Sequence, residues 1–188
     1  MIAWSKHIDV RQHFQRSVRI DTSQSSKDAL SDFVLHETGK KVLYRFFDQI
    51  SNSKQRAFTW TGPYGTGKSS LAQFLLEFLS RKDASRVSLK TSGRAVACRH
   101  FTNALNGKTG PWLVIRIAGE RRDAASLIGE NLLAAIIEYS PKCRVSRFKR
   151  IKGTWENGDV FELLEVAKQE AHKKKAGLLL AIDEMGKL

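Results

Sequence analysis

The sequence predicts an α/β fold organised around a parallel sheet. Two apolar runs, Pro111–Ile117 and Leu178–Glu184, have the nearly continuous hydrophobicity of strands that are buried on both faces. Longer segments with apolar residues at helical spacing precede and separate these runs. Because strands that alternate with helices return to the same end of a sheet, this order favours parallel pairing.

Residues 1–55 are expected to form a lead segment with helices, ahead of a core that spans 56–188. Within the lead segment, Asp28–Ile50 has a helical pattern, and Gly39 is expected to break it into two helices. Ala57–Thr61 is expected to be the first strand of the core, because a short β-rich run follows a turn-rich connection there.

The helices of the core are marked by apolar stripes and by capping residues. Asp123 is a suitable N-cap for one helix, and Asp159 with Glu162 has the spacing of a capping box for the next. Gly177 follows that helix, as expected of a residue that ends one. The segment Ala95–Ala104 is compatible with a helix or a strand. The stripe of the first core helix consists of Leu71, Phe74, Leu75, Phe78 and Leu79.

The composition is that of a globular domain with an excess of basic residues. Lys and Arg number 32 against 19 Asp and Glu, a formal net charge of +13. Such an excess favours contact with a polyanion, although a solvated basic surface also explains it. No apolar run is long enough to span a membrane, and the polar start differs from a signal peptide. A cytoplasmic location without membrane contact is therefore expected.

The segment Gly62–Ser69 reads GPYGTGKS and fits the pattern G-x-x-x-x-G-K-[ST] at each fixed position. It lies between an expected strand and an expected helix, which is the context that this motif requires. Glycines let backbone N–H groups converge on phosphate oxygens, and the helix N-terminus adds a partial positive charge. Lys68 is suited to contact the β- and γ-phosphates, and the Ser69 hydroxyl to hold Mg²⁺. The sequence therefore predicts a nucleotide-binding loop.

Two carboxylates, Asp183 and Glu184, end the second apolar run. Adjacent residues of a strand point to opposite faces, so these two carboxylates have different roles. Asp183 is suited to holding Mg²⁺, and Glu184 to activating a water molecule for attack on the γ-phosphate. The alternative is a surface loop that merely begins with two acids.

Together the two motifs resemble the Walker A and Walker B pair of P-loop ATPases with a catalytic glutamate, the group that contains the AAA+ proteins. The resemblance implies a P-loop NTPase core of AAA+/RecA-like type, with Glu184 and Lys68 as catalytic residues and Ser69 and Asp183 at the metal. The absence of an Asn-Lys-x-Asp motif favours ATP over GTP. The residues implied to bind the nucleotide are Gly62, Pro63, Tyr64, Gly65, Thr66, Gly67, Lys68, Ser69 and Ser70.

The stretches RSVRID, DAL, TWTGPYGTGKSSL and IDEMGK are also similar to the N-terminal part of large bacterial ATP-binding proteins of antiviral defence loci. In the resembled ATPases, the strand after Walker B lies between the Walker A and Walker B strands. Because the sequence ends at Leu188, we expect a longer protein whose sensor residue and arginine finger lie beyond this position.

A basic tract, Lys142–Trp155, contains no acid before Trp155 and includes the aromatic residues Phe148 and Trp155. Basic residues beside aromatic residues can contact phosphates and stack on bases, so the tract is a candidate DNA or RNA surface. A solvated insertion or a protein interface is the alternative. The candidate residues for nucleic-acid contact are Arg144, Arg147, Lys149, Arg150 and Lys152.

The expected function is an ATP-hydrolysing module of a larger cytoplasmic machine, acting as a homo-oligomer or with a partner effector protein. Antiviral defence and a link to nucleic acid are part of this expectation. The alternative is a scaffold that binds ATP to assemble an oligomer, with negligible turnover. A nucleic-acid translocase would additionally require turnover that DNA stimulates.

Overall fold

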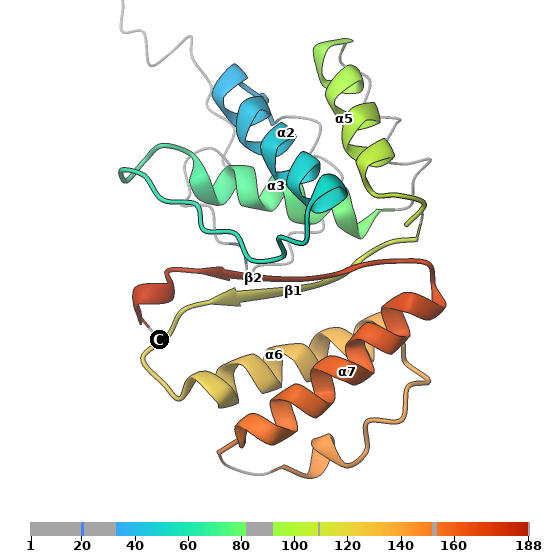
Figure 1. The fold of residues 1–188 in the computed structure, drawn as a ribbon. Coiled ribbons are helices and arrows are strands. Elements are labelled where there is room, and N and C mark those ends of the chain that lie inside the picture. The colour runs from blue at the N-terminus through green and yellow to red at the C-terminus, as the bar shows by residue number, and fades with distance from the viewer. Residues whose placement is uncertain (1–19, 21–32, 82–91, 109, 152–153, 188) are drawn as a thin grey trace, which may run out of the picture.

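The protein is a mixed α/β structure with a parallel pair of strands between two layers of helices (Figure 1). The computed structural model describes residue 20 and residues 33–81, 92–108, 110–151 and 154–187. Strand β1 (Leu113–Ala118) pairs in parallel with β2 (Leu178–Asp183), in a register that runs from Leu113 opposite Leu178 to Ala118 opposite Asp183. Both strands that the apolar runs predict are therefore confirmed, as is their parallel pairing.

One layer contains α2 (Glu37–Asn52), α3 (Lys68–Ser80) and α5 (Ser92–Ala104), above the strands in Figure 1. Its core is aromatic. Phe47 of α2 stacks on Phe101 of α5 at a ring-centroid distance of 4.6 Å, and Phe78 of α3 meets both rings edge-on. Large rings bury much apolar surface, so this cluster packs α3, the helix that follows the glycine loop, firmly against α2 and α5. The ambiguous segment around Ala95–Ala104 is thus a helix.

The other layer contains α6 (Ala124–Tyr139) and α7 (Asn157–Lys173), with the short 3-10 helix η3 (Phe148–Arg150) in their connection. Asp123 is the N-cap of α6, as predicted, because its carboxylate accepts a hydrogen bond from the Ser126 amide at 2.7 Å. A second 3-10 helix, η4 (Met185–Lys187), follows β2.

The prediction of a capping box at the start of α7 is wrong. The N-cap is Glu156, three residues before Asp159, so the helix begins at Asn157, and Glu156 makes no side-chain capping bond. Asp159 instead lies in the first turn, where its charge is favourable beside the helix dipole. At the other end, Lys175 takes the left-handed backbone conformation (φ 51°), and Gly177 serves a packing role, since a Cβ there would lie 2.6 Å from the Trp112 ring.

Gly39 does not break the helical segment in two, because α2 continues through it from Glu37 to Asn52. A Cβ at Gly39 would lie 3.3 Å from a methyl carbon of Leu71, so glycine allows α2 to approach α3 closely. Tertiary packing therefore outweighs the low helix propensity of glycine. The start of the predicted helical segment, residues 28–32, lies outside the described residues.

The prediction of a strand at Ala57–Thr61 is wrong, because the structure assigns this segment neither a strand nor a pairing partner. Within the described residues, β2 pairs with β1 alone. The segment is held instead by its aromatic side chains, since Phe58 and Trp60 pack on Phe46 of α2 at 4.6 and 6.2 Å between ring centroids. Because β2 pairs with β1 alone within the described residues, β2 is less buried than predicted, and every residue along it remains partly exposed.

None of the helices in the described part of the chain combines the length and the apolar character needed to cross a membrane.

Candidate functional site

The glycine loop Gly62–Ser69, called the phosphate loop below, has the backbone geometry that its glycines permit. Gly65 and Gly67 lie in the left-handed region, with φ of 79° and 78°, where a side chain would be strained. Gly67 is also the N-cap of α3, so the loop delivers the chain directly into the first turn of that helix. The first four N–H groups of a helix have no partner within it, and they attract anions together with the helix dipole. The loop therefore has the features of a phosphate cradle.

Lys68, the first residue of α3, folds back across the loop. Its ammonium donates hydrogen bonds to the carbonyl oxygens of Gly62 at 2.9 Å and Pro63 at 2.7 Å. Thr66 closes the loop further, because its hydroxyl donates to the Pro63 carbonyl at 2.9 Å. These contacts place one positive charge at the mouth of the cradle, where phosphate oxygens could replace the carbonyls as acceptors.

Ser69 and Asp183 meet although they stand 114 residues apart in the sequence. The Ser69 hydroxyl, in the first turn of α3, donates to an Asp183 carboxylate oxygen at the end of β2 at 2.9 Å. A hydroxyl and a carboxylate are hard oxygen ligands, and Mg²⁺ is usually held by one or two such groups together with phosphates and water. Among the described residues no group of three or more His, Cys, Asp or Glu forms a metal cluster. The pair offers two oxygen ligands that could hold Mg²⁺.

Glu184 follows Asp183 in a tight turn. It has a left-handed backbone (φ 53°), its side chain is exposed, and its amide donates to the Asp183 carboxylate at 2.9 Å. Gly119 makes room for this turn, since a Cβ there would lie 2.3 Å from the Glu184 carbonyl oxygen. A non-glycine residue in this conformation costs on the order of 1 kcal/mol, so the fold holds Glu184 in place against a local preference. The two carboxylates thus occupy different environments, as the sequence predicts.

An open groove of about 1020 Å³ adjoins the phosphate loop. Its lining includes Gly62, Gly67 and Lys68 of the loop, the segment Phe33–His36 and residues of α2. Phe58 and Trp60, just before the loop, also line it. This groove was not predicted from the sequence, although two of its aromatic lining residues, Phe58 and Trp60, stand just before the glycine loop.

The basic tract lies on the opposite side of the strands from the phosphate loop, in the connection between α6 and α7 (Figure 1). Arg147 pairs with two acids of α7, Glu162 at 2.8 Å and Asp159 at 3.4 Å. Phe148 and Trp155 are 4% exposed and stack on each other, so neither ring presents a face to a base. The exposed candidates are Arg144, Arg147 and Lys149, while the side chain of Arg150 and all of Lys152 lie outside the described residues.

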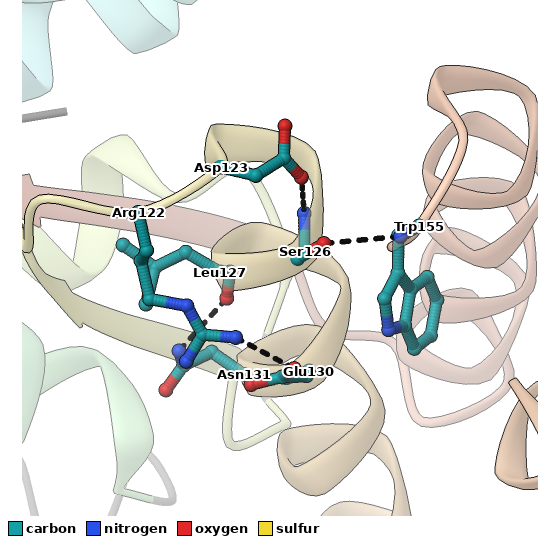
Figure 2. A network of polar contacts seen from close by, with 7 residues as sticks. All are labelled: Arg122, Asp123, Ser126, Leu127, Glu130, Asn131 and Trp155. Atoms are coloured by element: carbon teal, nitrogen blue, oxygen red, sulfur yellow. Dashed lines mark hydrogen bonds and ion pairs between the residues drawn. The ribbon is translucent and has the colours of Figure 1, made fainter. Parts of the chain in front are cut away.

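A polar network joins the end of β1 to this connection (Figure 2). Asp123 accepts a hydrogen bond from the Ser126 amide, and hydrogen bonding to the Ser126 side chain and then to this amide holds the pKa of the Asp123 carboxyl below its usual value. The Ser126 hydroxyl in turn accepts from the backbone amide of Trp155 at 3.0 Å. Arg122 pairs with Glu130 at 2.7 Å on the exposed side of α6. The network therefore attaches the end of the basic tract to the first turn of α6.

Comparison with models of known protein families finds no match, and comparisons with curated proteins and with solved structures find none either. A function for this chain therefore has to be inferred from its own residues and their geometry.

Proposed function

We propose that the chain is an ATP-binding and ATP-hydrolysing module with a P-loop core of AAA+/RecA-like type. The observation that carries this proposal is the hydrogen bond between Ser69 and Asp183. The two residues belong to separate motifs that the sequence assigns to one magnesium–nucleotide site, and a chance match of either motif would not bring them together. The left-handed glycines and the position of Lys68 over the loop support the same site.

The phosphates of the nucleotide would lie in the cradle of Gly65, Gly67 and the α3 N-terminus, with the Lys68 ammonium as their counter-charge. Ser69 and Asp183 would hold Mg²⁺, which supplies charge neutralisation at the phosphates when it is bound. Glu184 is placed beside Asp183 but on an exposed turn, where its carboxylate would orient a water molecule and accept its proton.

The base and ribose would lie in the groove that continues from the loop towards α2. Its aromatic wall, formed by Phe58 and Trp60, offers apolar surface to a purine ring. Lys41 and Arg45 of α2 line the same groove and add positive charge opposite the loop. A larger assembly and a role in antiviral defence also belong to the proposal, and both rest on the sequence resemblance.

Two measurements on the full-length protein test the proposal. The first is the binding of a fluorescent ATP analogue to wild type and to Lys68→Ala, with Lys54→Ala as the matched control, because Lys54 is an exposed lysine outside the groove. We expect the loss of Lys68 to weaken binding at least about tenfold, as removal of a charge-assisted hydrogen bond does, and the control to bind as wild type. Equal binding by Lys68→Ala and wild type would exclude the loop as the phosphate site.

The second measurement is phosphate release by wild type and Glu184→Gln in Mg²⁺. Wild type should exceed the background rate and the variant should not, since the amide cannot accept a proton from water. If both proteins bind ATP but release phosphate only at the background rate, the protein is not a hydrolase but a scaffold that uses ATP to assemble. Release that increases on addition of DNA would instead indicate a nucleic-acid translocase.

A further inference from the structure

Three polar residues recur along the face of α3 that meets the strands. Ser69, Gln73 and Glu77 are spaced four residues apart, so they share one side of the helix. The large rings of α3 point elsewhere, because Phe74 stacks on Phe33 and Phe78 packs against Phe47 and Phe101. Polar contacts therefore make up a substantial part of the junction between the phosphate-loop helix and the sheet.

Arg116 of β1 is the partner of this polar face. Its guanidinium donates to the Glu77 carboxylate at 2.9 Å, and the two side chains are only 19% and 18% exposed. Gln73 donates to the same carboxylate oxygen at 3.5 Å. A half-buried pair of this kind is less screened by solvent than a surface pair, so its geometry is held more tightly.

The junction is not optimised for stability alone. The Arg116 Nε and the Gln73 Oε1 are buried, and neither has a hydrogen-bond partner among the described residues. Buried polar atoms without partners cost free energy, and apolar side chains of similar volume often replace such pairs without loss of stability. The ion pair is therefore weak evidence for stability, whereas its contact with Glu77 constrains the orientation of α3.

The register of the sheet connects this ion pair to the candidate metal site. Arg116 lies opposite Ala181 and Ala118 lies opposite Asp183, so the ion pair is two residues from the level of the carboxylate. Along α3, Glu77 is eight residues from Ser69, a separation of about 12 Å at 1.5 Å per residue. The helix is thus attached to the sheet at two separated points, Ser69–Asp183 and Glu77–Arg116, which fix its direction along the sheet and limit its sliding.

We propose that Arg116 is a positioning residue, which acts through Glu77 to keep Ser69 within reach of Asp183. This inference rests on the proposed function, because the distance between Ser69 and Asp183 matters for nucleotide binding only if the two residues hold Mg²⁺. The loop amides and Lys68 contact phosphate without the metal, whereas the gain in affinity from Mg²⁺ depends on Ser69 and Asp183. The predicted effect of losing Arg116 is therefore confined to the magnesium-dependent part of nucleotide binding.

The test is the ratio of ATP-analogue affinities measured in Mg²⁺ and in EDTA, on the full chain. We expect Arg116→Ala and Glu77→Gln to reduce this ratio about tenfold, in the range typical of residues that orient metal ligands, while the affinity in EDTA changes little. Arg116→Lys, which keeps the charge, should recover part of the ratio. Arg121→Ala is the matched control, since Arg121 is an exposed arginine in the loop after β1.

A purely structural role predicts a different result, because partial unfolding lowers the affinities in Mg²⁺ and in EDTA by the same factor. Circular dichroism on each variant measures the folded fraction, and Glu77→Gln keeps the test valid if Arg116→Ala does not fold. An unchanged ratio in a folded variant, or a wild type that binds ATP without any gain from Mg²⁺, would overturn the inference while nucleotide binding stands. Absence of binding by wild type in either condition would overturn the proposed function itself.

Discussion

Replacement of Gly129 by alanine tests how the α6–α7 layer is packed. Gly129 lies in the interior of α6, and the indole of Trp155 covers it. A Cβ at this position would lie 2.3 Å from Cε3 and 2.4 Å from Cδ2 of that indole. Carbon atoms pack at about 3.5–4.0 Å, so the ring would have to retreat by more than about 1 Å.

Two effects of opposite sign determine the size of the change. Alanine in a helix interior is favoured over glycine by about 1 kcal/mol. Against this, an added methyl group in a filled core costs about 1–3 kcal/mol, and full displacement of a buried aromatic ring costs about 3–5 kcal/mol. Trp155 is 4% exposed, stacks on Phe148, and donates its backbone amide to Ser126, so it has little freedom to move. We therefore expect Gly129→Ala to lower the free energy of unfolding by about 1–3 kcal/mol.

The assay is urea denaturation followed by far-ultraviolet circular dichroism, which does not depend on the environment of a single tryptophan. Gly158→Ala is the matched control, because Gly158 lies in the first turn of α7 and a Cβ there meets nothing within 4 Å. The control should be as stable as wild type, or more stable by up to about 1 kcal/mol. A Gly129→Ala protein as stable as this control would refute the close packing of Trp155 on α6.

Three further predictions concern the loop, the carboxylate pair and a thiol. Gly67→Ala should weaken ATP-analogue binding about five- to thirtyfold, because a residue with a Cβ at φ of 78° is strained by about 1–2 kcal/mol. Titration of the analogue measures this, and unchanged affinity would argue against the loop geometry. In a double-mutant cycle without nucleotide, Ser69→Ala and Asp183→Ala should show a coupling of about 1 kcal/mol in urea denaturation, whereas additive effects would argue against their hydrogen bond. Burial, and then the charge of Glu170, raise the pKa of the Cys143 thiol, so the reactive thiolate forms only at higher pH than usual. Alkylation at pH 8 should therefore be slower than for a free cysteine, and faster in Glu170→Gln; a rate that ignores this substitution would contradict the assignment.

Local patterns were sufficient for several elements of this fold. The apolar runs at β1 and β2 are short, bounded by turn residues and followed by polar groups, which is the pattern of a buried strand. Asp123 was predictable as an N-cap because capping depends on a bond only three residues long. The glycine loop was equally local, since its pattern specifies backbone conformations rather than distant contacts.

Elements that depend on distant partners were not predictable in the same way. Ala57–Thr61 has the composition of a strand, but a strand exists only where a neighbour pairs with it, and its aromatic side chains pack on α2 instead. Gly39 has a low helix propensity, yet close approach to Leu71 keeps it within α2. Phe148 and Trp155 fit a base-stacking pattern equally well whether they are exposed or buried, and only the tertiary structure shows that they are buried. The four-residue spacing of Gln73 and Glu77 is visible in the sequence, but only the tertiary structure shows that Arg116 of β1 pairs with Glu77.

Asp183 makes hydrogen bonds to α3 and to the turn that leads from β1 towards α6. Its carboxylate accepts a hydrogen bond from Ser69 of the helix layer that carries the phosphate loop. Its backbone carbonyl accepts one from the amide of Gly119 at 2.8 Å, and Gly119 continues into the turn that begins α6 in the other layer. Only a glycine at position 119 lets that backbone come so close, because a Cβ would lie within 2.3 Å of the Glu184 carbonyl oxygen. The position of the carboxylate therefore depends on α3 and on the pairing of β2 with β1, and the hydrogen bond between Ser69 and Asp183 forms only when both are in place.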